Sequence, residues 1–509
     1  MLNKITDTAA LKTLIGIIFI LKFTVSFNTA LFEDEAIYWN WSLSPDPSYS
    51  FTTLIAIKIF TLIPGYLNEY TVRLPALLTN FVILFFFIKT GRLLGFAENR
   101  ILFAALFLFS IPFVTIYTSF ISPDTMLLMF SVISVYFSVR VIKNGTYSDW
   151  IFCGVSSGLM ILSKYTGAVF VSAIAIYILF KRNDLKEFSP GKLFAFLTAI
   201  LLVITPLLLW NILYEPVWFN HYINSDADYS GNNFTGRILN FILSQAAILL
   251  PASFVMFVFI IISQILKHKR STEENFLIFC GLFILISFAV LSLTGKSKGN
   301  WSFTAFIPLG YSFLFIRKNF FSGIVLAFMV GLNLLLLITL NLNSAQIKTL
   351  ADNDFGKYIN STYSDYWHGH TALTTNDRSW EERILKMKNR RSNIHEIDKV
   401  ILSVEPDYKF IASDNFNLSP LLKFYLKKDN VYLLGDLRFK YINSAEVNKD
   451  LIGKDAIVIT YGNSDIGYLQ KNFEELKEIK IMRFVLSDES TEEFRIIHGK
   501  NYKPESLYK

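Results

Sequence analysis

Long apolar segments recur along the first two-thirds of the chain and predict membrane-spanning helices. Runs such as 81–88, 200–210 and 324–340 carry no charge. A spanning helix needs about 20 mostly apolar residues, and we predict about eleven spans on this basis. They lie near 11–31, 72–90, 101–120, 124–142, 149–163, 165–181, 193–213, 240–266, 275–294, 302–316 and 320–342. No comparable stretch follows, so residues 1–342 are predicted to form a transmembrane domain.

The remaining residues, 343–509, have the pattern of a small soluble α/β domain. Runs rich in β-branched and aromatic residues predict strands, and amphipathic segments between them predict helices. The strand-like runs are 408–412, 431–434, 456–460 and 481–485, and the clearest helical patterns are 417–428 and 465–478. The expected fold class is therefore an α-helical polytopic membrane protein with a C-terminal α/β domain.

Composition supports the membrane assignment. Hydrophobic residues make up 52% of the chain and charged residues only 17%, which is unusual for a soluble protein. The net charge of +7 is explained by basic residues that flank membrane helices, so no nucleic-acid partner is expected. Cys153 and Cys280 both lie in apolar runs and give no information about the compartment of the soluble domain.

Charge distribution between the predicted loops indicates an orientation. If the N-terminus is cytoplasmic, the inside loops hold most of the Lys and Arg residues, as the positive-inside rule requires. An odd number of spans then places residues 343–509 outside. We expect the stretch 14–31 to remain as the first helix, because no convincing signal-peptide cleavage site follows it.

The first outside loop begins with three adjacent acids, Glu33, Asp34 and Glu35, in the motif FEDEAIYWNWS. Neighbouring carboxylates repel, so one can hold a proton while another acts as a general base. The aromatic residues Tyr38 and Trp39 offer flat surfaces for a sugar or for lipid headgroups. The alternative is an interfacial helix cap with an aromatic belt, which needs no catalysis.

Basic residues in the other outside loops are candidates for binding a phosphate. Lys164 lies in SKYTG, and Lys296 and Lys298 lie in GKSKGNW, against the positive-inside trend. A lysine binds phosphate as a compact point charge. The alternatives are a lysine that snorkels from a helix end and a flexible basic loop. The outside segments also contain Arg73, Asp124, Asn300 and Trp301.

Residues 218–228, WFNHYINSDAD, contain His221 beside Asp226. One histidine with scattered acids is a weak metal signature. We therefore expect His221 to contact substrate and predict neither a metal site nor a cofactor.

Together these segments resemble a known family. FEDEAIYWNWS is similar to the acidic first-loop motif of the GT-C-type, polyprenyl-phosphate-sugar-dependent glycosyltransferases, the relatives of protein mannosyltransferases and lipid A aminoarabinose transferases (glycosyltransferase family 39 and its neighbours). The segments VRLPALL (72–78), SPD (122–124), LSKYTG (162–167), PLLLWN (206–211), KGNWSF (298–303) and SDNFNLSPLLKFYL (413–426) follow in the family's order. One departure is SYSFTTL at 48–54, where many relatives have an aspartate or histidine and paired prolines.

The resemblance implies a GT-C fold and an inverting transfer of sugar from a polyprenyl-phosphate donor to an envelope acceptor, which is lipid A or lipopolysaccharide, another glycan, or a protein hydroxyl. It implies a bacterial inner membrane, with the α/β domain in the periplasm. Asp34 would be the base with Glu35 beside it, and Lys164, Lys296 and Lys298 would stabilise the leaving phosphate. Trp39, Tyr165 and Trp301 would line sugar or lipid. The alternative function is a transporter or flippase of lipid-linked sugars, for which inverted repeats and charges near the midplane are expected.

Overall fold

The structure is a computed structural model in which helices dominate the first two-thirds of the chain. The residues that it describes are 7–45, 47–62, 67–214, 234–295, 298–315, 320–354, 356–357, 379–404, 408–434, 449–462, 464, 466–487 and 490–504. They pack as two compact units. The first unit comprises Met1–Ser26 with Pro45–Ile338, and the second comprises Phe27–Ser44 with Thr339–Lys509.

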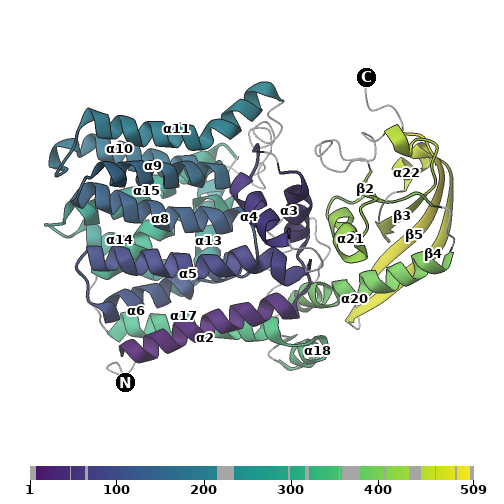
Figure 1. The fold of residues 1–509 in the computed structure, drawn as a ribbon. Helices are drawn as coiled ribbons and strands as arrows, with labels where there is room; N and C mark the ends of the chain where they lie inside the picture. Colours follow the sequence, from purple (N-terminus) through teal and green to yellow (C-terminus); the bar gives the residue numbers. More distant parts are fainter. Residues whose placement is uncertain are drawn as a thin grey trace. The chain divides into compact units, whose positions relative to one another are not determined.

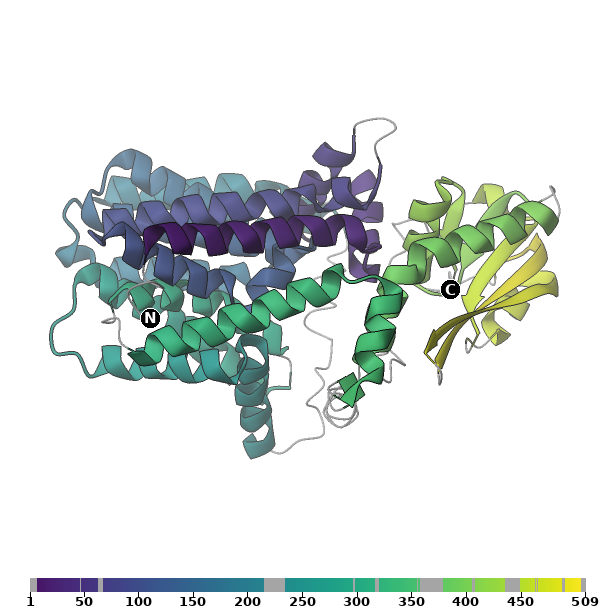
Figure 2. The ribbon, with the colours of Figure 1, turned by 90° about the horizontal axis from the view of Figure 1, so that it is seen from below.

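The first unit is a bundle of helices that run alongside one another (Figures 1 and 2). Its α-helices are α2 (Thr8–Asn28), α4 (Phe51–Thr61), α5 (Glu69–Leu93), α6 (Glu98–Phe109), α7 (Pro112–Tyr117), α8 (Pro123–Lys143), α9 (Tyr147–Ser163), α10 (Gly167–Phe180), α11 (Pro190–Leu213), α13 (Phe234–Leu249), α14 (Pro251–Ile265), α15 (Thr272–Leu293), α16 (Phe306–Ser312) and α17 (Phe320–Asn341). Short 3₁₀ helices, η1 (Arg182–Asp184), η2 (Gly299–Ala305) and η3 (Phe313–Phe315), lie between them.

Among the described residues, six helices are long and apolar enough to cross a membrane: α2, α5, α8, α11, α15 and α17. The pair α13 and α14, which is bent by 109° at the break between them, makes a seventh if it counts as one span. This is fewer than the eleven predicted spans, because several predicted segments are short or broken. The segment 101–120 divides before Pro112, where the residue preceding proline is driven out of the helical conformation.

The hairpin of α8 and α9 shows how local sequence sets helix boundaries. Pro123 occupies the first turn of α8, and Ser122 precedes it as the N-cap. Gly145, with φ of +64°, turns the chain after α8, a conformation that glycine adopts without strain. The side chain of Thr146 then accepts a hydrogen bond from the Asp149 N–H and starts α9. The two helices are therefore antiparallel neighbours.

Close packing of α9 against α11 depends on two glycines one turn apart. A Cβ added at Gly154 would lie 2.4 Å from the carbonyl oxygen of Phe196, and one added at Gly158 would lie 3.2 Å from that of Ile200. Small residues four apart allow two helix backbones to approach closely inside a membrane, where the hydrophobic effect between helices is absent. These glycines thus fix the α9–α11 contact.

The second unit combines helices with a five-stranded mixed sheet (Figure 1). Its helices are α3 (Glu33–Leu43), α18 (Ser344–Asp352), α20 (Trp380–Val404), α21 (Leu418–Leu426), α22 (Gly467–Asn472) and the 3₁₀ helix η6 (Lys449–Leu451). Its strands are β1 (Phe410–Ser413), β2 (Val431–Leu433), β3 (Ala456–Tyr461), β4 (Phe473–Ser487) and β5 (Ser490–Tyr502). The order is β2-β1-β3-β5-β4, with β1 parallel to β2 and β3, and β5 antiparallel to its neighbours.

The α/β prediction is confirmed for this region, with one wrong helix and one strand that was not predicted. The helix predicted over 465–478 ends at Asn472, and the chain continues as β4 from Phe473. The unpredicted strand is β5, which pairs with β4 along nearly its whole length. The local pattern of apolar and charged residues in 473–480 suits either structure, and pairing with β5 decides for a strand.

Candidate functional site

Two predicted site residues of the first unit form a buried ion pair. The Lys164 Nζ lies 2.9 Å from both carboxylate oxygens of Asp124, and both side chains are at most 7% exposed. Asp124 lies in the first turn of α8, and Lys164 is the C-cap of α9. Each charge therefore has the sign that its helix end favours. A lysine so buried does not snorkel, so that alternative does not describe it.

Polar residues of the predicted SYSFTTL and SKYTG segments lie together around this pair. The Tyr165 hydroxyl donates a hydrogen bond to the Ser48 carbonyl oxygen, and the Thr52 and Ser163 hydroxyl oxygens are 2.7 Å apart. Ser50 has φ of +51° and a buried hydroxyl without a hydrogen-bond partner. The segment that departs from the family pattern thus contributes to the same polar end of the bundle.

Arg73 was predicted as a candidate cation, and the structure buries it fully inside the bundle. Its Nη1 donates to the Ser26 carbonyl oxygen at 3.2 Å, and its guanidinium lies 4.9 Å from the centre of the Phe120 ring. These contacts join α2 and α5 through a cation that also stacks on an aromatic face.

A third buried cation, Lys22, was not predicted. Its Nζ lies 3.0 Å from Asn80 Oδ1 and 2.8 Å from Thr118 Oγ1, and the side chain has no exposed surface. Lys22 on α2 thereby joins α5 and the end of α7. Its position inside the otherwise apolar run 14–31 was the available signal, because ionisable residues at membrane depth are costly and usually have a partner.

The predicted GKSKGNW segment gives Lys298 an exposed position immediately before η2. Asn300 is half-buried in η2. Trp301 is 8% exposed and packs edge-on to Phe288, with 6.4 Å between ring centres. Trp301 was predicted to line substrate, and in the structure it contributes to helix packing.

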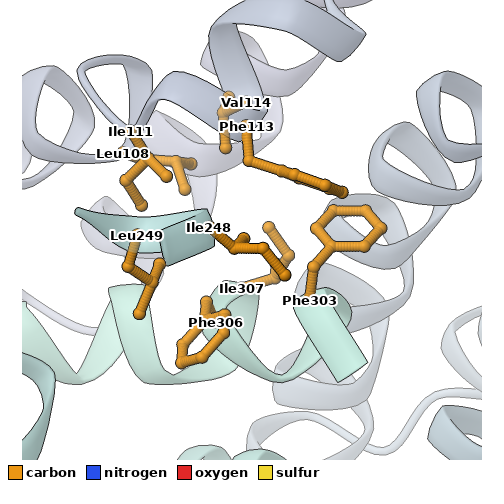
Figure 3. Close-up of a pocket in the computed structure, with 9 residues that line it drawn as sticks. All are labelled: Leu108, Ile111, Phe113, Val114, Ile248, Leu249, Phe303, Phe306 and Ile307. Carbon is orange, nitrogen blue, oxygen red and sulfur yellow. The ribbon is translucent and has the colours of Figure 1, made fainter. Parts of the chain in front are cut away.

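A small apolar pocket opens beside this segment (Figure 3). It is lined by Leu108, Ile111, Phe113, Val114, Ile248, Leu249, Phe303, Phe306 and Ile307. The rings of Phe113 and Phe303 lie 4.5 Å apart between their centres. Since every lining side chain is a hydrocarbon, the pocket offers no group for acid–base chemistry.

In the second unit, the three adjacent acids form the first turn of α3, and each has a different environment. Glu35 is 1% exposed, and its Oε2 accepts a hydrogen bond from the Phe32 N–H at 3.0 Å. Glu33 Oε1 lies 2.8 Å from Arg390 Nη2. Asp34 alone of the three has an exposed side chain. Glu35 thus fits the predicted helix-cap alternative, whereas Asp34 keeps a position from which a base can act.

The sequence is similar to known glycosyltransferases over part of its length. Residues 50–210 match the family described as dolichyl-phosphate-mannose-protein mannosyltransferase. The lipid A galacturonosyltransferase RgtD of Rhizobium johnstonii is 24% identical over 304 residues, which are 57% of this chain and 63% of that relative. The aligned part is thus less than two thirds of the relative's length.

Solved structures match over almost the whole chain. ArnT from Cupriavidus metallidurans bound to undecaprenyl phosphate gives a TM-score of 0.60 at 13% identity, covering 96% of this chain and 98% of that chain. Its apo structure gives 0.57 at 12% identity, with the same coverage of both chains. The chain has the GT-C fold. The fold that the sequence motifs implied is therefore confirmed.

The aromatic residues of the acidic motif are packed within the second unit. Trp39 is 4% exposed and meets the Phe424 ring edge-on at 5.0 Å between ring centres. The half-buried Tyr38 lies edge-on to Trp41 at 5.7 Å. Trp39 was predicted as a substrate platform, and the structure gives it a packing role against α21.

Two residues predicted to contact substrate, His221 and Lys296, lie outside the described residues. Within the described ranges, no group of three or more His, Cys, Asp or Glu side chains is arranged to hold a metal ion. The absence of a cofactor stays a prediction. Arg390, the partner of Glu33, carried no signal in the sequence, because it is one of many charged residues in α20.

Proposed function

We propose that this protein is an inverting glycosyltransferase, which takes a sugar from a polyprenyl-phosphate donor and adds it to an envelope acceptor outside a bacterial inner membrane. The observation that carries the proposal is the arrangement of the three acids in the first turn of α3. Its first turn is fixed by Glu33 and Glu35, while the Asp34 carboxylate between them is exposed. A carboxylate on a fixed helix turn is suited to orient and deprotonate a hydroxyl group.

The chemistry follows from these groups. Asp34 removes the proton of an acceptor hydroxyl, whose oxygen attacks the anomeric carbon of the donor sugar. The bond from that carbon to the phosphate oxygen breaks, and the electron pair leaves with the polyprenyl phosphate. Basic side chains stabilise the negative charge of that leaving group, and Lys164 and Lys298 are our candidates.

Lipid A is the acceptor that we favour. The relative RgtD is named as a lipid A galacturonosyltransferase, and ArnT was crystallised with undecaprenyl phosphate, which is the kind of lipid that carries the proposed donor sugar. A donor already linked to a lipid supplies an activated sugar where nucleotide sugars are absent. No described feature favours a transporter of lipid-linked sugars.

The test is sugar transfer by the purified protein in lipid nanodiscs, with a panel of defined polyprenyl-phosphate sugars and lipid A as acceptor. Products are identified by mass spectrometry. Asp34→Asn should lower turnover by about 100-fold or more, while Asp184→Asn, which removes an exposed carboxylate from η1, should leave turnover unchanged.

Two results would count against the proposal. One is near-normal transfer by a well-folded Asp34→Asn variant, which would refute Asp34 as the base and leave the acidic motif as a helix cap. The other is movement of the intact donor across a proteoliposome membrane without any sugar transfer, which would identify a flippase. Lipid analysis of envelopes with and without the gene then identifies the natural acceptor.

A further inference from the structure

The residues just before Asp34 are held by the C-terminal part of the second unit. The Ala30 N–H donates to the Met387 carbonyl oxygen at 3.2 Å, and the Leu31 N–H donates to the Tyr425 hydroxyl at 2.8 Å. Both N–H groups precede α3, where backbone donors lack helical partners. Residues of α20 and α21 therefore accept the backbone hydrogen bonds of the segment that leads into the acidic motif.

Arg390 adds an ion pair to these contacts. Its Nη2 lies 2.8 Å from Glu33 Oε1, with the arginine side chain 8% exposed and the glutamate side chain 29% exposed. Glu33 is the residue immediately before Asp34. A charge-assisted hydrogen bond in a largely water-excluded setting is stronger and more directional than one at the surface. The pair therefore restrains the helix turn that carries the proposed base.

A second acidic residue, Glu492 on the sheet, lies near enough to the guanidinium to interact with it electrostatically. Glu492 on β5 is 5% exposed and accepts a hydrogen bond from Asn393 Nδ2 at 3.2 Å. Burial by itself lowers the pKa of Arg390, but the interactions with Glu33, then Tyr461 and Glu492, outweigh this and raise it. Arg390 is thus a cation that pairs with Glu33 beside the proposed base and also interacts with Glu492 on the sheet.

The far end of α3 is held by aromatic packing. Trp39 meets Phe424 on α21, and Trp41 lies 6.1 Å from the Phe416 ring, between ring centres. With its first turn tied by Arg390 and its later turns packed against aromatic rings, α3 has little freedom to tilt or rotate within this unit. The geometry around Asp34 is therefore set by residues several hundred positions later in the chain.

We propose that Arg390 is a positioning residue for catalysis and that the C-terminal α/β region is a working part of the transferase. The inference rests on the proposed function, since it assumes that Asp34 acts on the acceptor. Arg390 acts through Glu33, whose position fixes that of Asp34. A displacement of about 1 Å at a reacting group can cost on the order of 100-fold in rate, so the loss should appear in kcat.

The experiment compares Arg390→Gln, Glu33→Gln, their combination and Arg390→Lys in the full-length protein in nanodiscs. Each single Gln variant should lower kcat by about 10- to 100-fold and change the KM for the donor less than about threefold. The double variant should be no slower than the slower single variant, because both changes remove one contact. Arg390→Lys should restore kcat in part, since an ammonium keeps the charge but not the planar fork.

Lys428→Gln is the matched control. Lys428 follows α21 and pairs at 3.0 Å with Asp398, which lies on α20, the helix that carries Arg390. Lys428 has no part in the contacts of α3 given above. Its removal should change kcat less than about twofold, as expected for a half-exposed pair. If this control lowers kcat as much as Arg390→Gln does, the effect comes from general destabilisation of the domain and the inference is wrong.

The remaining outcomes separate the two proposals. If Asp34→Asn is inactive while folded Arg390→Gln and Glu33→Gln keep normal kcat, the proposed function stands and the positioning role is refuted. If the native protein transfers no sugar, the proposed function itself fails. If Asp34→Asn transfers sugar at the native rate, the role of Asp34 as the base fails, and the positioning role of Arg390 fails with it. Should Arg390→Gln not fold, Glu33→Gln decides alone, because it breaks the same contact from the more exposed side and leaves Arg390 with Glu492. The positioning role is also refuted if the loss of kcat in every variant simply follows the drop in its unfolding temperature.

Discussion

The buried pair of Asp124 and Lys164 allows a structural role to be separated from donor binding. Lys164→Gln or Asp124→Asn leaves one buried charge without the partner that lies 2.9 Å away. Breaking a buried ion pair from one side costs about 3–5 kcal/mol. The double variant, with two neutral amides, should recover most of that stability, since no unpaired charge remains.

Donor binding should respond differently. If Lys164 also contacts the donor phosphate, losing that charge-assisted contact costs about 1.5–3 kcal/mol, or roughly 10- to 150-fold in affinity or rate. The double variant would then regain stability without regaining donor affinity. Asp124→Asn should keep donor affinity, because the ammonium remains and a competing carboxylate is gone. Lys164→Arg should restore donor affinity only in part.

The assay measures the apparent unfolding temperature in nanodiscs by tryptophan fluorescence, together with kcat and the KM for a defined polyprenyl-phosphate sugar. The matched control is the double variant Arg140→Gln, Asp149→Asn. These two residues form an ion pair at 2.6 Å that also joins α8 to α9, at the end of the hairpin opposite to Asp124 and Lys164. This control perturbs the same two helices and should leave the donor KM unchanged. Recovery of both stability and donor KM by the Asp124→Asn, Lys164→Gln variant would refute a phosphate contact by Lys164.

Three further predictions follow from the structure. Gly154→Ala should lower the unfolding temperature, at a cost of about 1–3 kcal/mol of stability, because its Cβ would lie 2.4 Å from a backbone oxygen. The control is Gly16→Ala, which has no atom within 4 Å of its added Cβ and should leave the unfolding temperature unchanged. Equal effects of the two substitutions would argue against close helix packing at Gly154. Burial raises the pKa of Glu492, so the stabilisation from its bound proton is present below about pH 4.3 and is lost as the pH rises through the raised pKa. The difference in unfolding temperature between the native protein and Glu492→Gln should therefore fall as the pH rises. A difference that grows with pH would contradict a raised pKa of Glu492. Lys298→Gln should raise the donor KM by about 10-fold or more if the exposed ammonium contacts phosphate, and an unchanged KM would remove Lys298 from the site.

The structure shows how much of the fold and the site was predictable. The predicted spans contain helices, and residues 408–412, 431–434, 456–460 and 481–485 contain strands. The acidic motif was predicted as either a base or a helix cap, and the structure assigns Glu35 to the cap and leaves Asp34 exposed. Fewer of the predicted spans than expected are single long helices in the described part of the chain, because apolar composition does not reveal where a proline or a 3₁₀ turn interrupts a helix.

The sequence by itself determined which segments are apolar, where the soluble region follows and which loops carry acids and lysines, because transfer of a segment out of water depends mainly on its own composition. The tertiary structure decided the partner of each charge. Lys164 pairs with Asp124, 40 positions earlier, and Glu33 pairs with Arg390, 357 positions later. It also grouped residues 27–44 with 339–509 and made 473–487 a strand by pairing it with β5. Such pairings depend on groups that meet only when distant segments pack together, and no local pattern contains that information.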